Sequence, residues 1–202
     1  MNLLLKRTLR IVARVLGSRG VQASAGTWCV VCGLLLGGLD ASAQPAPSRE
    51  YQVKAVFLFN FAQFVEWPPA AFADANSPIV IGVLGENPFG TYLDETVRGE
   101  QVNNRPLAVQ RYRRVDEITT CHVLFISRSE THHLEQILAS LKGRSILTVS
   151  DDEDFVQRGG MIRLATVQNK IRLIINVDAA KAANLTISSK LLRAAELMTP
   201  SK

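Results

Sequence analysis

The sequence predicts an α/β fold, in the form of a single layered domain with a mixed, mostly parallel sheet flanked by helices and a late antiparallel hairpin. Continuous apolar runs of strand length recur along the chain, which is typical of strands covered on both faces. Amphipathic segments separate these runs, so strands and helices alternate. Near the C-terminus two strand-length segments are separated only by a short polar turn, which indicates an antiparallel hairpin.

The first predicted element is a helix over residues 50–66, because its large apolar residues recur at helical spacing. Trp67-Pro68-Pro69 ends it, since proline lacks the N–H that a helix needs. A buried strand follows over residues 78–84, and a glycine-containing turn leads into a helix over residues 91–97. Residues 107–109 alternate apolar and polar side chains and predict an edge strand.

The next predicted elements are a buried strand over residues 122–126, an amphipathic helix over residues 131–141 and a strand over residues 145–149. Gly143 suits the end of that helix. Ser150 followed by Glu153 has the capping-box spacing, so we expect a helix from there to Arg158. In this interpretation the acidic cluster at residues 151–154 stabilises the first turn of the helix through its dipole.

The last part of the chain predicts the hairpin and two more helices. The hairpin strands are residues 161–165 and 171–175, with Gln168 and Asn169 in the turn. Asp178 is a candidate cap for a short helix that ends at Ala183. Ser188 is a candidate cap for a final helix over residues 189–198.

Residues 1–43 predict a secretory signal that is cleaved after Ala43. A basic stretch precedes an apolar run over residues 27–39, and small residues stand at the two positions that a signal peptidase reads. The run is shorter than the roughly 20 residues of a membrane-spanning helix. We therefore expect a periplasmic protein, with a linker at residues 44–49 and the folded domain at residues 50–198. An uncleaved anchor and a start codon assigned too far upstream stay open as alternatives.

The net charge of +5 belongs mostly to this leader. Residues 44–202 contain 18 basic and 17 acidic residues, and their only dense basic cluster is residues 111–114. Because nucleic-acid binding needs a basic face, we expect no nucleic-acid partner.

The reactive residues predict neither a catalytic site nor a metal site. Cys29 and Cys32 are lost with the leader, so the mature chain keeps Cys121, which is either buried or available for pairing between chains. Adjacent strand residues project to opposite faces, so Cys121 and His122 cannot act as a dyad. His132 and His133 are expected to be exposed at the start of a helix, and no zinc pattern is present. We expect no cofactor.

A turn over residues 85–90 occupies the position at which doubly wound folds bind phosphates. Its glycine spacing matches neither dinucleotide nor P-loop patterns, so the simpler interpretation is a turn that needs glycine for its backbone angles. If a small ligand binds here, the candidate contacts are Gly85, Asn87 and Phe89.

Several dispersed segments resemble the YfiR-like family of periplasmic proteins. They occur in the family's order and together cover nearly all of residues 50–198. The segments are residues 53–61 with Trp67-Pro68, 82–85 with 88–90, 121–127, 147–151, 159–162, 175–176, 179–180 and 185–192.

This resemblance implies a regulatory binding protein rather than an enzyme. Well-known members repress an inner-membrane diguanylate cyclase by binding its periplasmic domain, which lowers cyclic di-GMP and biofilm formation, and an outer-membrane lipoprotein sequesters them. Relatives with disulfides use more cysteines than Cys121 alone provides, so an internal redox switch is in doubt. A homodimer, and a periplasmic small-ligand sensor of another signalling system, stay open as alternatives. The partner-binding residues are unknown at this point.

Overall fold

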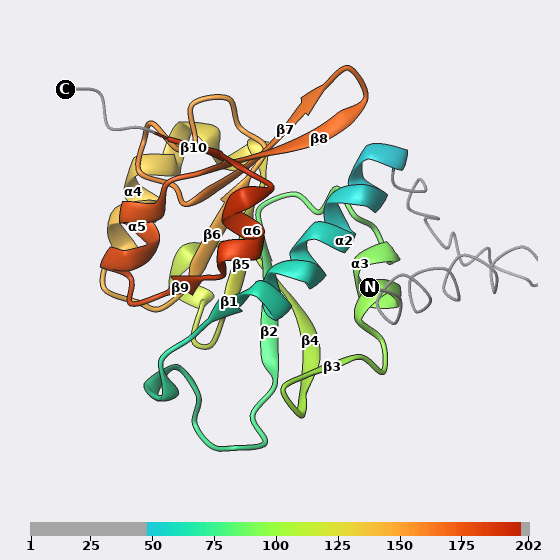
Figure 1. Ribbon diagram of the computed structural model, residues 1–202, viewed down its shortest axis with the longest axis vertical. Helices are drawn as coiled ribbons and strands as arrows, with labels where there is room; N and C mark the ends of the chain where they lie inside the picture. The colour runs from blue at the N-terminus through green and yellow to red at the C-terminus, as the bar shows by residue number, and fades with distance from the viewer. Residues whose placement is uncertain (1–47, 199–202) are drawn as a thin grey trace, which may run out of the picture. The chain divides into compact units, whose positions relative to one another are not determined.

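The computed structural model describes residues 48–198, which form an α/β domain around one large mixed sheet (Figure 1). The predictions for residues 1–43 and for most of the linker therefore lie outside the described residues. In spatial order the strands of the sheet are β10 (Glu196–Leu197), β8 (Lys170–Ile175), β7 (Ile162–Val167), β6 (Leu147–Ser150), β5 (Val123–Ile126), β2 (Ile79–Leu84), β4 (Arg105–Tyr112) and β3 (Gln101–Val102).

The centre of the sheet is parallel and its two ends contain antiparallel pairs. β2 pairs in parallel with β4 and β5, β5 with β6, and β6 with β7. β7 and β8 form the antiparallel hairpin, and β3 pairs antiparallel with β4. The mixed, mostly parallel sheet and the late hairpin are therefore confirmed.

Helices cover both faces of the sheet, so the central strands are buried throughout. Their residue ranges are α2 (Arg49–Phe64), α3 (Tyr92–Val97), α4 (Leu134–Ser140), α5 (Val177–Ala182) and α6 (Ser189–Arg193). Along β5, Val123 and Phe125 belong to the hydrophobic core that contains α2, whereas Leu124 and Ile126 belong to the core that contains α4. This alternation explains why β5 is continuously apolar in sequence.

The first helix begins where predicted and ends two residues early. Ser48 caps α2, since its Oγ accepts a hydrogen bond from the Tyr51 N–H at 3.5 Å. α2 ends at Phe64 because Val65 and Glu66 form β1 (Val65–Glu66), which pairs with β9 (Thr186–Ile187). A 3₁₀ turn, η1 (Pro69–Ala71), then leads towards β2.

The predicted strand at residues 107–109 is longer than expected and does not lie at the edge. β4 lies between β2 and the short β3, so β3 is the last strand on that side. Two further 3₁₀ segments, η2 (Val115–Glu117) and η3 (Arg128–His133), flank β5 in the chain. The predicted helix at residues 131–141 is therefore 3₁₀ in its first turn, before α4 begins at Leu134.

The helix predicted for residues 150–158 is wrong, because this segment is a series of turns. Ser150 is the last residue of β6, and its hydroxyl donates to the Ile126 carbonyl at 2.8 Å. The Asp152 carboxylate accepts the Asp154 N–H at 3.1 Å, which closes a local turn in place of a helical one. The dipole interpretation of the acidic cluster is wrong for the same reason.

The hairpin turn is confirmed, and both C-terminal helices differ from prediction. Gln168 and Asn169 have φ values of +50° and +59°, as a tight two-residue hairpin turn requires. Asn176, rather than Asp178, caps α5 by accepting the Ala179 N–H at 3.0 Å. α6 ends at Arg193, because the following residues form β10 beside β8.

Candidate functional site

The carboxyl ends of the parallel strands β2, β4, β5 and β6 meet at one edge of the sheet. In open α/β folds this edge is the usual place for binding sites. The chain concentrates buried charge at this edge, in residues that come from α2 and from the ends of β5 and β6.

The central contact is an ion pair between Lys54 and Asp151. Lys54 is 0% exposed and Asp151 is 2% exposed, and Lys54 Nζ lies 2.5 Å from Asp151 Oδ2. Glu50, one helical turn earlier on α2, places Oε1 2.5 Å from the same Nζ. The Tyr51 hydroxyl donates to Asp151 Oδ2 at 2.9 Å, and the Lys54 ammonium lies 4.5 Å from the centre of the Tyr51 ring.

Local sequence explains how these groups come together. Glu50 and Lys54 are four residues apart on α2 and so lie on one side of the helix. Asp151 follows β6 directly, and Arg128 begins the 3₁₀ segment after β5. Because β5 and β6 are adjacent and parallel, their ends bring Arg128 and Asp151 together beneath the first turns of α2.

The residues around Glu50 and Tyr51 determine the protonation state of these two side chains. The hydrogen bonds from Lys54 and from the Thr166 hydroxyl lower the pKa of Glu50, which therefore stays ionised. Burial, followed by the neighbouring charge of Asp151, raises the pKa of Tyr51 far above its ordinary value. Tyr51 therefore stays a neutral hydrogen-bond donor.

The outer side of the group is open to solvent. The Arg128 side chain is 61% exposed, donates to the Asp151 carbonyl at 2.9 Å, and places Nε 3.4 Å from Asp151 Oδ1. The Glu50 side chain is 39% exposed and accepts the Thr166 hydroxyl of the hairpin at 2.7 Å. We call Glu50, Tyr51, Lys54, Arg128 and Asp151 the carboxyl-edge cluster. It joins α2, the ends of β5 and β6 and the β7–β8 hairpin.

This arrangement suits binding better than reaction chemistry. The Lys54 ammonium is ion-paired and shielded from solvent, so it is not a nucleophile that a substrate could reach. Among residues 48–198 no group of three or more His, Cys, Asp or Glu residues could hold a metal ion. The accessible groups are a cation and an anion on rigid elements, which is what recognition of a charged partner surface needs.

The predicted turn at residues 85–90 lies beside the carboxyl-edge cluster. Asn87 Oδ1 accepts the Phe89 N–H at 3.1 Å, and Asn87 Nδ2 donates to the Gly90 carbonyl at 3.0 Å. Phe89 is buried and makes an edge contact with the ring of Tyr51. Gly85 has a φ of +86°, and a Cβ there would collide with the Ser129 hydroxyl. These residues shape the turn, and binding of a ligand to them stays a prediction.

Cys121 and His122 do not form a catalytic dyad, because each makes its hydrogen bonds with other groups. Cys121 is buried, which raises the pKa of its thiol to about 12, and the thiol donates to the Val123 carbonyl. His122 bonds elsewhere, with Nδ1 accepting the Val80 N–H at 3.0 Å and Nε2 lying 3.2 Å from the Ala71 carbonyl oxygen. His132 and His133 are exposed.

No sequence pattern predicted the carboxyl-edge cluster as a whole, although the position of Lys54 was one signal for it. Lys54 stands inside the apolar stretch Val53–Lys54–Ala55–Val56, and a lysine in such a position needs a buried counter-ion. Asp151 is that counter-ion, 97 residues further along the chain.

Comparison with known families agrees with the resemblance found in the sequence. None of the curated proteins compared with the chain matches it. No helix among residues 48–198 is long and apolar enough to cross a membrane. A family model described as YfiR/HmsC-like matches residues 51–196, from the first turn of α2 to β10. The chain therefore belongs to the YfiR/HmsC-like family, which consists of periplasmic signalling regulators that act through a protein partner rather than by catalysis.

Proposed function

We propose that this chain is a periplasmic repressor of an inner-membrane diguanylate cyclase. It binds the periplasmic domain of the cyclase, which lowers cyclic di-GMP and thereby biofilm formation. The family match over residues 51–196 is the observation that carries the proposal. An outer-membrane lipoprotein is the proposed second partner, which would sequester the repressor and release the cyclase.

The proposed contact surface is the exposed side of the carboxyl-edge cluster. Arg128 and Glu50 are the accessible charges there, and each is bonded to a residue that is itself held by the fold. Held charges lose little conformational freedom on binding, which favours recognition. Charges of both signs on one rim suit a protein surface of matching pattern better than a uniformly charged polymer.

Cellular cyclic di-GMP tests this proposal. A strain that lacks the gene should contain more cyclic di-GMP, and the wild-type gene with its leader intact should restore the original level. Arg128→Gln should restore it only in part, because the rim loses its accessible cation. Arg98→Gln is the matched control, since Arg98 is an exposed arginine that follows α3, away from the carboxyl-edge cluster.

The amount of each variant in the periplasm is measured in parallel, so that lower abundance is not mistaken for weaker repression. Cyclic di-GMP that does not change on deletion, under conditions in which the protein is produced, would contradict repression of a cyclase. Full repression by Arg128→Gln would contradict the proposed contact surface while leaving the repressor role intact.

A further inference from the structure

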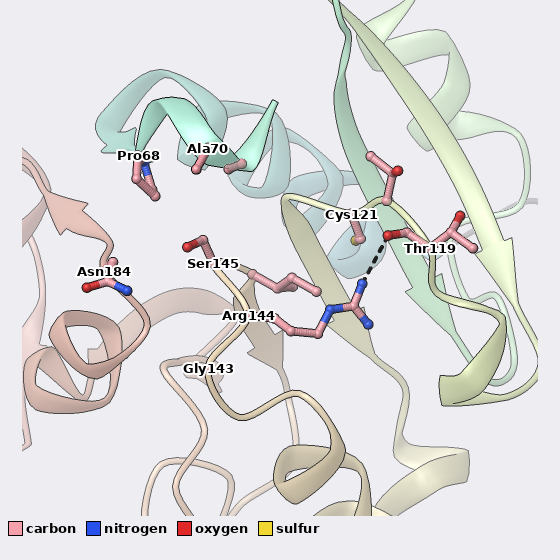
Figure 2. Close-up of a pocket in the computed structure, with 11 residues that line it drawn as sticks. Pro68, Ala70, Thr119, Cys121, Gly143, Arg144, Ser145 and Asn184 are labelled. Carbon is pink, nitrogen blue, oxygen red and sulfur yellow. Dashed lines mark hydrogen bonds between the residues drawn. The ribbon is translucent and has the colours of Figure 1, made fainter. Parts of the chain in front are cut away.

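A cavity of about 560 Å³ lies at the amino-terminal edge of the parallel strands (Figure 2). Two of its walls are the segments that lead into β5 and β6, residues 119–121 and 143–146. Residues at the start of η1 form a further wall, and Asn184 faces the cavity from the loop before β9. Because the carboxyl-edge cluster and the turn at residues 85–90 lie at the opposite ends of these strands, the cavity is a separate site.

The polar side of the cavity is positively charged. Among the described residues that line it, Arg144 alone carries a charge. Arg144 Nη2 donates to the carbonyls of Ile118 at 2.8 Å and Thr119 at 3.1 Å, and these bonds hold the guanidinium in place. Nε and Nη1 of Arg144 have no partner within residues 48–198, so they remain available as donors. Thr119 and Ser145 contribute hydroxyl-bearing side chains to the same lining.

The rest of the lining is mixed, because Thr120 and Asn184 add polar groups to several small apolar residues. Pro68, Ala70 and Ala71 form one wall, and the lining also includes Ile146, which is buried. Cys121 also lines the cavity, but burial keeps its thiol protonated and uncharged, so it does not offset Arg144. The volume of about 560 Å³ falls within the range typical of small-molecule sites.

We propose that this cavity binds a small organic anion, with a carboxylate or phosphate group on an apolar body. The anionic group accepts hydrogen bonds from Arg144, and the apolar body packs against Pro68, Ala70 and Ala71. Arginine suits both groups, because it stays positively charged and its free N–H donors can make charge-assisted hydrogen bonds to an oxygen of a carboxylate or a phosphate.

Titration of the ¹⁵N-labelled protein, purified after export of the full-length gene product, tests the proposal. The probes are benzoate and phenyl phosphate, with uncharged benzamide as the matched control. At least one anion should cause saturable amide shifts at residues 119–121 and 143–146, with a dissociation constant in the millimolar range, about 10 mM or below. The probe with the lower dissociation constant shows whether the cavity prefers a carboxylate or a phosphate group. Benzamide should bind at least about tenfold more weakly.

Two variants separate the site from general effects on the fold. Arg144→Gln should weaken binding by about tenfold or more. Because Arg144 also holds residues 118–119, Ala70→Phe provides an independent test: Ala70 is exposed, and a phenyl ring there fills the apolar part of the cavity. Arg98→Gln should bind like the wild type. Absence of saturable shifts with both anions, equal binding of benzamide, or unchanged binding in Arg144→Gln and Ala70→Phe would each overturn the proposal.

Discussion

At the residue scale, burying Lys54 and Asp151 removes both charges from water, which costs free energy, while the attraction between the two charges offsets much of that cost. Each buried ion loses hydration worth several kcal/mol, which the partner charge and further hydrogen bonds must offset. Here Glu50 and Tyr51 supply those additional contacts, so each charge has more than one partner. The pair fixes the position of α2 on the end of β6, which in turn positions the exposed Arg128 and Glu50.

Removal of Lys54 alone should therefore destabilise the protein strongly. In Lys54→Met the buried Asp151 carboxylate loses its buried cation and keeps only the exposed Arg128 guanidinium, and we expect a loss of about 3–5 kcal/mol in the free energy of unfolding. Urea denaturation measures it. The double variant Lys54→Met with Asp151→Leu should regain most of this loss, because it buries no unpaired charge. A loss below about 1 kcal/mol in the single variant would show that the pair is not buried as described.

His122 should make the stability of the protein sensitive to mild acid. Its Nδ1 accepts the Val80 N–H, and only the neutral imidazole can do so. Burial lowers the pKa of His122 below its ordinary value of 6.5, so the unfolded chain takes up the proton first as the pH falls. The free energy of unfolding should therefore be constant above about pH 6.5 and decrease below it.

Denaturation curves measured between about pH 7.5 and pH 5 check this dependence. In His122→Gln the decrease over that range should be much smaller than in the wild type. The carboxyl groups with shifted pKa values, including Glu50, have lowered values, so they titrate below this window. Equal slopes in the wild type and in His122→Gln would contradict the assignment.

At the element scale, the close contact of β2 with β4 and β5 depends on a glycine. Gly82 lies in the middle of β2, and a Cβ built there would lie 2.8 Å from both Cys121 Sγ and the Tyr112 ring. The thiol and the ring therefore occupy the volume that a larger residue at position 82 would need. Cys121, two residues before β5, and Tyr112, the last residue of β4, thus pack over the same point of the central strand.

Gly82→Ala should destabilise the protein through overpacking, by about 1–3 kcal/mol in the free energy of unfolding. Adding Cys121→Ala removes the sulfur atom and should restore part of that loss. Thermal or urea denaturation of the two single variants and the double variant gives the interaction energy of positions 82 and 121. Strictly additive effects would contradict the proposed contact.

The segment after β6 shows how tertiary contacts override a local signal. Ser150 and Glu153 have the spacing of a capping box, yet Ser150 is used as a strand residue and bonds to Ile126 of β5. Asp151 forms an ion pair with Lys54, and the Asp152 carboxylate accepts the Asp154 N–H in a local turn. Ser150, Asp151 and Asp152 thus each have a partner other than the first turn of a helix.

At the scale of the whole molecule, two sites lie at opposite edges of one sheet. β5 and β6 each run from the cavity at Arg144 to the carboxyl-edge cluster. The proposed repressor contact and the proposed anion site thus share two rigid strands. Because the two experiments measure different quantities, cyclic di-GMP in cells and binding of a purified protein, either proposal can fail without the other.

At the same scale, the secretory leader predicted at residues 1–43 can be tested by the position at which it is cleaved. The protein recovered from the periplasm should begin at Gln44, because Ala43 presents a small residue at the cleavage position. Intact mass measurement or N-terminal sequencing checks this. Ala43→Arg should leave the precursor uncleaved. An exported protein that keeps residues 1–43 would support the alternative of an uncleaved anchor.

Elements whose signals are local could be predicted from the amino-acid sequence alone. The apolar periodicity of α2, the continuous hydrophobicity of β2 and β5, and the polar turn at Gln168 and Asn169 each depend on neighbours along the chain. Dispersed motifs also identified the family correctly, because they kept their order over the whole domain. Side-chain period and turn chemistry act over a few residues, so one sequence is enough to reveal them.

Features that join distant residues became visible only in the folded structure. Asp151 meets Lys54 across 97 residues, and nothing beside Asp151 in the chain distinguishes a buried counter-ion from a helix cap. Likewise, residues 196–197 form β10 because β8 offers them an unpaired edge, although their own pattern continues a helix. Burial and strand pairing provide more free energy than local propensity, and both depend on partners that sequence spacing does not reveal.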